Sequence, residues 1–181
     1  QEKLRVGQTA YHRESSRLES LKNITERYDG YGNSIRKVMS NKDRVPGLLG
    51  VVADIIKVEK EYEIAVETAL GGSIQNIVTD TEETAKRMIQ YLKQNKFGRA
   101  TFLPLTSMHG SGGIRDAQAL KEPGVIGLAN TLVTVEAKFQ VLADQLLGRT
   151  IVVDHIDHGI AIARKYRQSL RLVTLEGDLI N

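Results

Sequence analysis

The sequence contains no cysteine and no tryptophan, and only three phenylalanines among its 181 residues. Without cysteine the chain can form no disulfide, no thiolate nucleophile and no cysteine-ligated zinc site, which fits a reducing cytoplasm. Its apolar runs are shorter than the roughly 20 residues that a membrane-spanning helix needs. The N-terminal residues also lack the apolar centre of a signal peptide. We therefore expect a cytoplasmic globular protein with no membrane partner.

The motifs of several enzyme classes are missing as well. No G-x-x-x-x-G-K-[ST] segment occurs, which excludes a P-loop ATPase in this chain. "HGSGG" at 109–113 resembles a phosphate or oxyanion loop but lacks the lysine and the helix that such a loop needs, so a flexible loop is the simpler interpretation. "DHIDH" at 154–158 would suit a metal, yet its position after a strand gives Asp154 or Asp157 an ordinary role as a helix cap. We expect no catalytic residue, no cofactor and no metal.

Short apolar runs alternate with amphipathic segments from Val45 onward. "VPGLLGVVADII" is strand-like, "EYEIAVETALGG" has helical spacing, "SIQNIVTD" is strand-like, and the helix that follows ends at Gly98. A similar order recurs in "FQVLADQLLGR", "TIVVDH", "IDHGIAIARKYRQ" and "LRLVTL". Gly71 and Gly148 close the first helix of each unit. This internal repeat predicts a mixed α/β (α+β) fold of two similar tandem subdomains.

The remaining segments set the predicted boundaries. A thin heptad pattern through Leu4, Tyr11 and Leu18 predicts a coiled-coil helix at the N-terminus. A glycine-rich and then polar stretch separates the two repeats. The predicted divisions are a coiled-coil arm at 1–30, a first subdomain at 31–107, a connecting loop at 108–124 and a second subdomain at 125–181.

Basic side chains are concentrated in one part of the chain. The net charge is only +3, but residues 85–121 hold seven basic side chains and one acidic. Lys86 and Lys93 are two helical turns apart and share a stripe, with Arg87, Lys96 and Arg99 nearby. Such a stripe can bind phosphate backbones without reading sequence, although a solvated helix face is the alternative. The scarcity of aromatics gives little support for base stacking.

On these residues alone, the sequence favours a binding or assembly module over an enzyme. A small-molecule-binding or metal-binding α/β regulatory or enzymatic domain remains the alternative. That alternative would use the loop at 108–114 or the "DHIDH" segment.

The segments "EYEIAVETALGGSIQNIVTD", "KFGRATFLPL", "LLGRTIVVD" and "LVTLEGDLIN" occur in this order after the predicted arm and "VPGLLGVVADII". This arrangement closely resembles the hinge domain of bacterial SMC (structural maintenance of chromosomes) proteins over about residues 30–181. The resemblance implies a hinge at the end of a long coiled coil, remote from ATPase heads that this chain does not contain. It also implies homodimerisation of two SMC arms, a nucleoid location, and a role in chromosome condensation and segregation with accessory subunits of an SMC complex.

The resemblance also implies which residues act. Hinges of this family pair through glycine-bearing ends of each subdomain, although the same glycines could serve only as helix caps and turns. The implied dimer interface comprises Gly71, Gly72, Ser73, Gly148, Arg149, Thr150 and Gly177. Weak, sequence-independent DNA contact is implied for Lys86, Arg87, Lys93, Lys96 and Arg99. The family continues past the equivalent of Asn181 into a glycine-rich strand and a returning helix, so we expect part of the dimer surface there.

Overall fold

The computed structural model describes residues 32–110, 112–167 and 170–181. The predicted coiled-coil arm at 1–30 lies outside these residues. The first half contains α3 (Asn33–Met39), β1 (Leu48–Val51), α4 (Val52–Ile55), β2 (Lys57–Val58), α5 (Glu63–Leu70), β3 (Ile77–Thr79), α6 (Glu82–Asn95) and β4 (Phe102–Pro104). The second contains β5 (Val125–Leu128), β6 (Val133–Thr134), α7 (Gln140–Leu147), β7 (Thr150–Val153), α8 (Ile156–Lys165), β8 (Arg171–Thr174) and β9 (Leu179–Ile180). Short 3-10 turns lie between several of these elements.

The two halves repeat one strand arrangement. In the first sheet β1 is antiparallel to β3, and β3 is parallel to β4. In the second sheet β5 is antiparallel to β7, β7 is parallel to β8, and β9 adds an antiparallel edge. The register shifts at matching positions, between Leu48 and Gly50 and between Val125 and Gly127. This confirms the predicted repeat of two similar α/β units.

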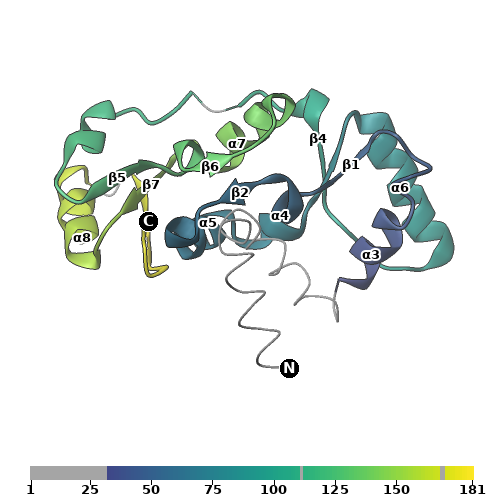
Figure 1. The fold of residues 1–181 in the computed structure, drawn as a ribbon, viewed down its shortest axis with the longest axis horizontal. Coiled ribbons are helices and arrows are strands. Elements are labelled where there is room, and N and C mark those ends of the chain that lie inside the picture. The colour runs from purple at the N-terminus through teal and green to yellow at the C-terminus, as the bar shows by residue number, and fades with distance from the viewer. Residues whose placement is uncertain (1–31, 111, 168–169) are drawn as a thin grey trace, which may run out of the picture.

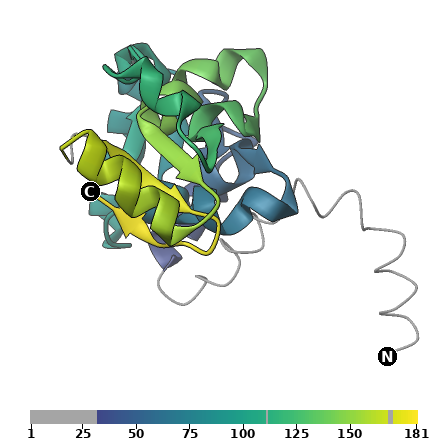
Figure 2. The ribbon, with the colours of Figure 1, turned by 90° about the vertical axis from the view of Figure 1, so that its left-hand side faces the viewer.

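One helix in each half follows the central strand and covers its sheet. In α6 the buried side chains are Ala85, Met88 and Leu92, which recur at helical spacing. Burying Met88 and Leu92 contributes about 1.5–3 kcal/mol for each side chain. In the second half α8 packs on β7, β8 and β9 (Figure 2).

A shared core joins the halves. β2 pairs antiparallel with β6, so a short sheet crosses from one half to the other. Helix α5 packs against α7, and Figure 1 shows α4, α5 and β2 at the centre of the elongated molecule, next to β6 and α7. Buried Val66 and Ile77 of the first half belong to the same apolar cluster as Leu142 and Val173 of the second. The repeats are therefore packed as one body, while the predicted division at 108–124 stays a prediction.

The structure differs from the sequence prediction at several element ends. "VPGLLGVVADII" is a strand only as far as Val51, and a single helical turn, α4, follows it. Helix α6 ends at Asn95 with Lys96 in a left-handed conformation, one turn before the predicted stop at Gly98. His155, not an aspartate, is the N-cap of α8, because its Nδ1 accepts a hydrogen bond from the backbone N–H of Asp157. A neutral imidazole nitrogen can accept such a bond as a carboxylate does.

The start of α6 is stabilised by Asp80, which supports a first prediction. The Thr84 hydroxyl and the Thr81 backbone N–H both donate hydrogen bonds to Asp80 Oδ1, at 2.7 and 2.6 Å. The hydrogen bond from Thr84 is the main reason that the pKa of Asp80 lies below its usual value of 3.8. Because the folded pKa is the lower one, this stabilisation is present above pH 3.8 and is lost as the pH falls through the folded pKa.

We expect Asp80→Asn to lower the free energy of unfolding at neutral pH by about 0.3–1 kcal/mol, the effect of one charge at a helix N-terminus. The difference from the unchanged chain should shrink below about pH 4, where the carboxylate is protonated. Thermal unfolding across a pH series measures it, with Asp43→Asn as the control, since Asp43 is exposed and makes no side-chain hydrogen bond or ion pair among the described residues. A difference that persists unchanged in acid would contradict the prediction.

Candidate dimer interface and basic surface

The first glycine corner follows α5. The helix ends at Leu70, and Gly71 then takes a φ of +55°, a conformation that L side chains rarely adopt. Gly71 and Gly72 are both exposed, and a Cβ added to either would meet no atom of the described residues within 4 Å. Gly72 has no left-handed φ, so nothing in the described chain requires glycine there. Open space beside bare backbone is what a close approach by another backbone needs.

The second glycine corner differs from the first. Gly148 follows α7 in a right-handed conformation, with a φ of −72°, and it is buried. Only Arg149 separates it from β7, whereas a five-residue 3-10 turn from Gly71 to Gln75 precedes β3. Thr150 is consequently the first residue of β7 and is buried, while Ser73 lies half-buried within the turn. The sequences around Gly71 and Gly148 are similar, but the two corners have different structures. The corner at Gly71 is the more exposed.

Arg171 connects the two corners within one chain. Its Nη1 donates hydrogen bonds to the carbonyl oxygen of Ala69 at 3.1 Å and to Thr150 Oγ1 at 2.8 Å. Ala69 lies at the end of α5, two residues before Gly71. The structure therefore brings residues 69–72 of the first half close to residues 148–150 of the second. Arg171 is not among the residues predicted from the sequence. An arginine at the start of a strand does not indicate a hydrogen bond to Ala69, 102 residues earlier.

Gly177 packs against its own chain. It lies in the turn between β8 and β9 with a φ of +97°. A Cβ at this position would come within 2.9 Å of Ile64 Cγ2 and 3.1 Å of Thr68 Oγ1, both on α5. The positive φ and the close packing on α5 within the same chain therefore explain why residue 177 is glycine. Exposed apolar surface surrounds the turn, because Ile64 and the β9 residue Leu179 are 52% and 42% exposed.

The predicted basic residues all lie on the exposed side of α6 and the segment after it. Lys93, Lys96 and Arg99 line one open pocket of about 670 Å³, whose apolar part includes Leu92 and Ala100. Lys86 and Arg87 lie earlier on α6 and do not line this pocket. The structure thus gathers three of the five predicted DNA-contacting residues and leaves the other two along the same helix. Lys96 has a left-handed φ of 54°, and Arg99, three residues later, lines the same pocket as Lys93.

The segments proposed for metal or ligand chemistry have ordinary contacts. His158 Nδ1 lies 2.7 Å from Asp154 Oδ1, and this hydrogen bond lowers the pKa of Asp154. In the described parts of the chain, no three His, Cys, Asp or Glu side chains form a group that could hold a metal ion. No helix in the same parts is long and apolar enough to cross a membrane.

The duplicated α/β unit with a common core defines the class of protein, a mixed α+β domain built from two similar halves. Comparison with known sequences identifies the family within this class. The profile described as "SMC proteins Flexible Hinge Domain" matches residues 45–163. The chain belongs to this family of SMC hinge domains.

Individual relatives agree with this assignment. Chromosome partition protein Smc of Lactiplantibacillus plantarum is 41% identical over 93% of this chain, and that of Bacillus subtilis is 37% identical over 92%. The chain spans 14% of the length of each of these relatives.

Solved structures of hinge domains resemble the fold. One is an asymmetric dimer of the Geobacillus stearothermophilus SMC hinge domain, with a TM-score of 0.78 and 34% identity, covering 98% of this chain and 74% of that one. Another is the Pyrococcus furiosus SMC hinge domain, with a TM-score of 0.70 and 29% identity, covering 90% and 83%.

Proposed function

We propose that this chain is the hinge of a longer SMC protein and that it pairs with a second copy to join two SMC arms. The observation that carries the proposal is the exposed Gly71–Gly72 corner, where bare backbone faces open space. At Gly72 the isolated chain does not need glycine, so a second copy at close range supplies the reason for it. The solved dimer of the Geobacillus stearothermophilus hinge, 34% identical, supports the same role.

The interface that we propose extends from Gly71, Gly72 and Ser73 to the corner at Gly148, Arg149 and Thr150. Arg171 holds the two corners together, so they can form one continuous surface. Gly177 belongs to this proposal through the apolar surface beside it, since Ile64 and Leu179 are each about half exposed, at 52% and 42%. Burying such side chains would contribute about 25 cal/mol for each Å² of apolar surface removed from water.

The hinge acts in this proposal by association and not by catalysis. The longer protein would organise and segregate chromosomes in the cytoplasm, at the nucleoid, together with accessory subunits of its complex. The names of the relatives, chromosome partition proteins Smc, support this role. We also propose weak, sequence-independent DNA contact through Lys86, Arg87, Lys93, Lys96 and Arg99.

Sedimentation equilibrium tests the pairing. We expect twice the chain mass for the 181-residue chain, or for the same chain extended beyond Asn181. If both chains sediment at their own monomer mass at micromolar concentration, which is 20.1 kDa for the 181-residue chain, the proposal is contradicted. Comparing the dissociation constants of the two chains separates the contribution of the described corners to pairing from that of residues beyond Asn181.

A further inference from the structure

A second pocket, of about 590 Å³, opens next to the corner between α7 and β7. Small-molecule sites have volumes of roughly 300–1,000 Å³, so this one can hold a ligand of moderate size. Its lining comes from three segments that are distant in sequence: residues 112–116, the residue before β7 and the residue before β8. The residues that matter here are Gly112, Gly113, Arg115, Asp116, Arg149 and Leu170.

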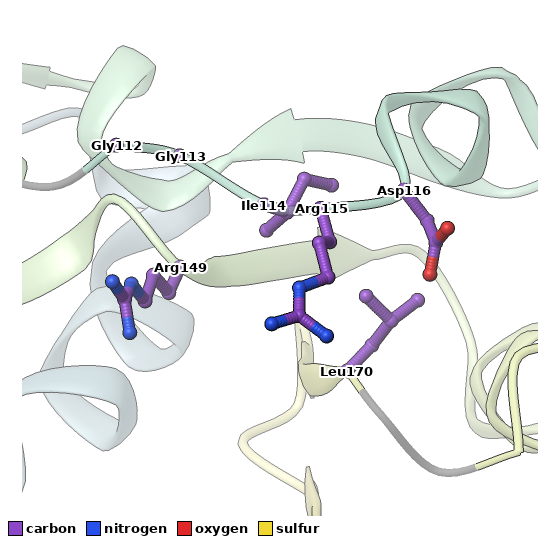
Figure 3. A pocket seen from close by; sticks show the side chains of 7 residues that line it. All are labelled: Gly112, Gly113, Ile114, Arg115, Asp116, Arg149 and Leu170. Carbon is purple, nitrogen blue, oxygen red and sulfur yellow. The ribbon is translucent and has the colours of Figure 1, made fainter.

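The pocket is dominated by two arginines. In Figure 3 the guanidinium groups of Arg115 and Arg149 both lie below the 112–116 segment, with that of Arg115 near Leu170 and that of Arg149 turned to the left, away from Arg115. The carboxylate of Asp116 lies away from Arg149, at the end of the pocket nearer Leu170. Both arginines are exposed, and neither has a hydrogen-bond or ion-pair partner within the described residues. The lining therefore offers two unpaired positive charges and one negative charge.

Unpaired guanidinium groups at one pocket favour an anion. Each presents a planar fork of N–H donors that matches the oxygens of a phosphate, and charge-assisted bonds of this kind are about twice as strong as neutral ones. Gly112 is exposed, and a Cβ added there would meet no atom of the described residues within 4 Å. Leu170 is buried and gives the site an apolar wall.

We propose that the pocket between Arg115 and Arg149 binds a phosphate group, carried by a free phosphorylated ligand or by a nucleic acid. The site is separate from the basic residues of α6, which line a different pocket. The sequence alternative of a small-molecule site at the loop 108–114 involves the same segment, because Gly112 and Gly113 of "HGSGG" line this pocket. Arg149 also belongs to the proposed dimer interface, whereas Arg115 does not, so Arg115 is the residue to change.

Isothermal titration with inorganic pyrophosphate tests the site. We expect saturable binding to the unchanged chain and about tenfold weaker binding to Arg115→Gln, because a charge-assisted hydrogen bond is lost. Arg36→Gln is the matched control: it makes the same change at an exposed residue of α3, and its binding should equal that of the unchanged chain. Circular dichroism confirms the fold of each variant, and sedimentation shows whether pairing is retained.

The outcomes separate the possible sources of the phosphate. If Arg115→Gln weakens binding of both pyrophosphate and duplex DNA, the natural ligand is a nucleic-acid backbone. If it weakens only pyrophosphate binding, the ligand is a free phosphorylated molecule. Absence of saturable pyrophosphate binding, or equal binding by the Arg115→Gln and unchanged chains, would overturn the proposal. Neither result would bear on dimerisation, which sedimentation measures independently.

Discussion

Leucine in place of Gly72 is expected to raise the dissociation constant of the hinge dimer by about 5- to 150-fold, because inserting a side chain into a packed contact costs about 1–3 kcal/mol. The folded chain itself should accept the change. Among residues 32–110, 112–167 and 170–181, no atom lies within 4 Å of a Cβ at this position, and the residue needs no left-handed φ. Gly71 is less suitable, since its φ of +55° would strain any replacement and confuse loss of pairing with loss of stability.

Sedimentation equilibrium over a concentration series measures this effect, and thermal unfolding checks that the monomer is intact. Gln90→Leu is the control, because Gln90 is an exposed residue of α6 that lies outside the proposed interface and lines neither of the two pockets. We expect this control to remain dimeric. If the leucine variants at 72 and 90 pair equally well, Gly72 does not lie at the interface.

The sequence predicted the fold well because the internal repeat carries strong local signals. Helical spacing in "EYEIAVETALGG" and alternating β-branched runs such as "TIVVDH" each specify one element. The errors fall at element ends, where contacts outside the local sequence decide. The turn of α4 forms where Val52 and Ala53 are fully buried, so tertiary packing overrides the β propensity of the segment. His155 caps α8 although two aspartates flank it.

The candidate site was less predictable than the fold. The open space at Gly72 and the internal contact of Gly177 depend on which segments pack together, and glycine has the same appearance in both cases. The pairing of Arg171 with Ala69 and Thr150 depends on a contact between the two halves. Arg115 and Arg149 line one pocket although 33 residues separate them in the sequence, and no local pattern marks such a pair. Helical spacing did predict that Lys86 and Lys93 share a side of α6.

Removing three positive charges from the pocket at the end of α6 should reduce DNA binding and its dependence on salt. In the variant Lys93→Gln, Lys96→Gln and Arg99→Gln, we expect lower affinity for duplex DNA at low salt. If each side chain neutralises one phosphate, the slope of the logarithm of the binding constant against the logarithm of salt concentration should flatten by about 2.7. The loss should be similar for unrelated DNA sequences, because phosphate contacts carry no base information.

A second triple variant of equal net charge shows whether the α6 pocket or only the total charge determines DNA binding. Lys42, Lys60 and Lys121 are exposed lysines outside the α6 pocket, and changing all three to glutamine removes the same net charge. Fluorescence anisotropy over a salt series should show a much smaller change in slope for this control, since long-range attraction is screened beyond about 8–10 Å at physiological salt. Equal slopes for the two triple variants would mean that only total charge matters. Because Lys93, Lys96 and Arg99 surround one pocket, a local site requires their slope to be the flatter one.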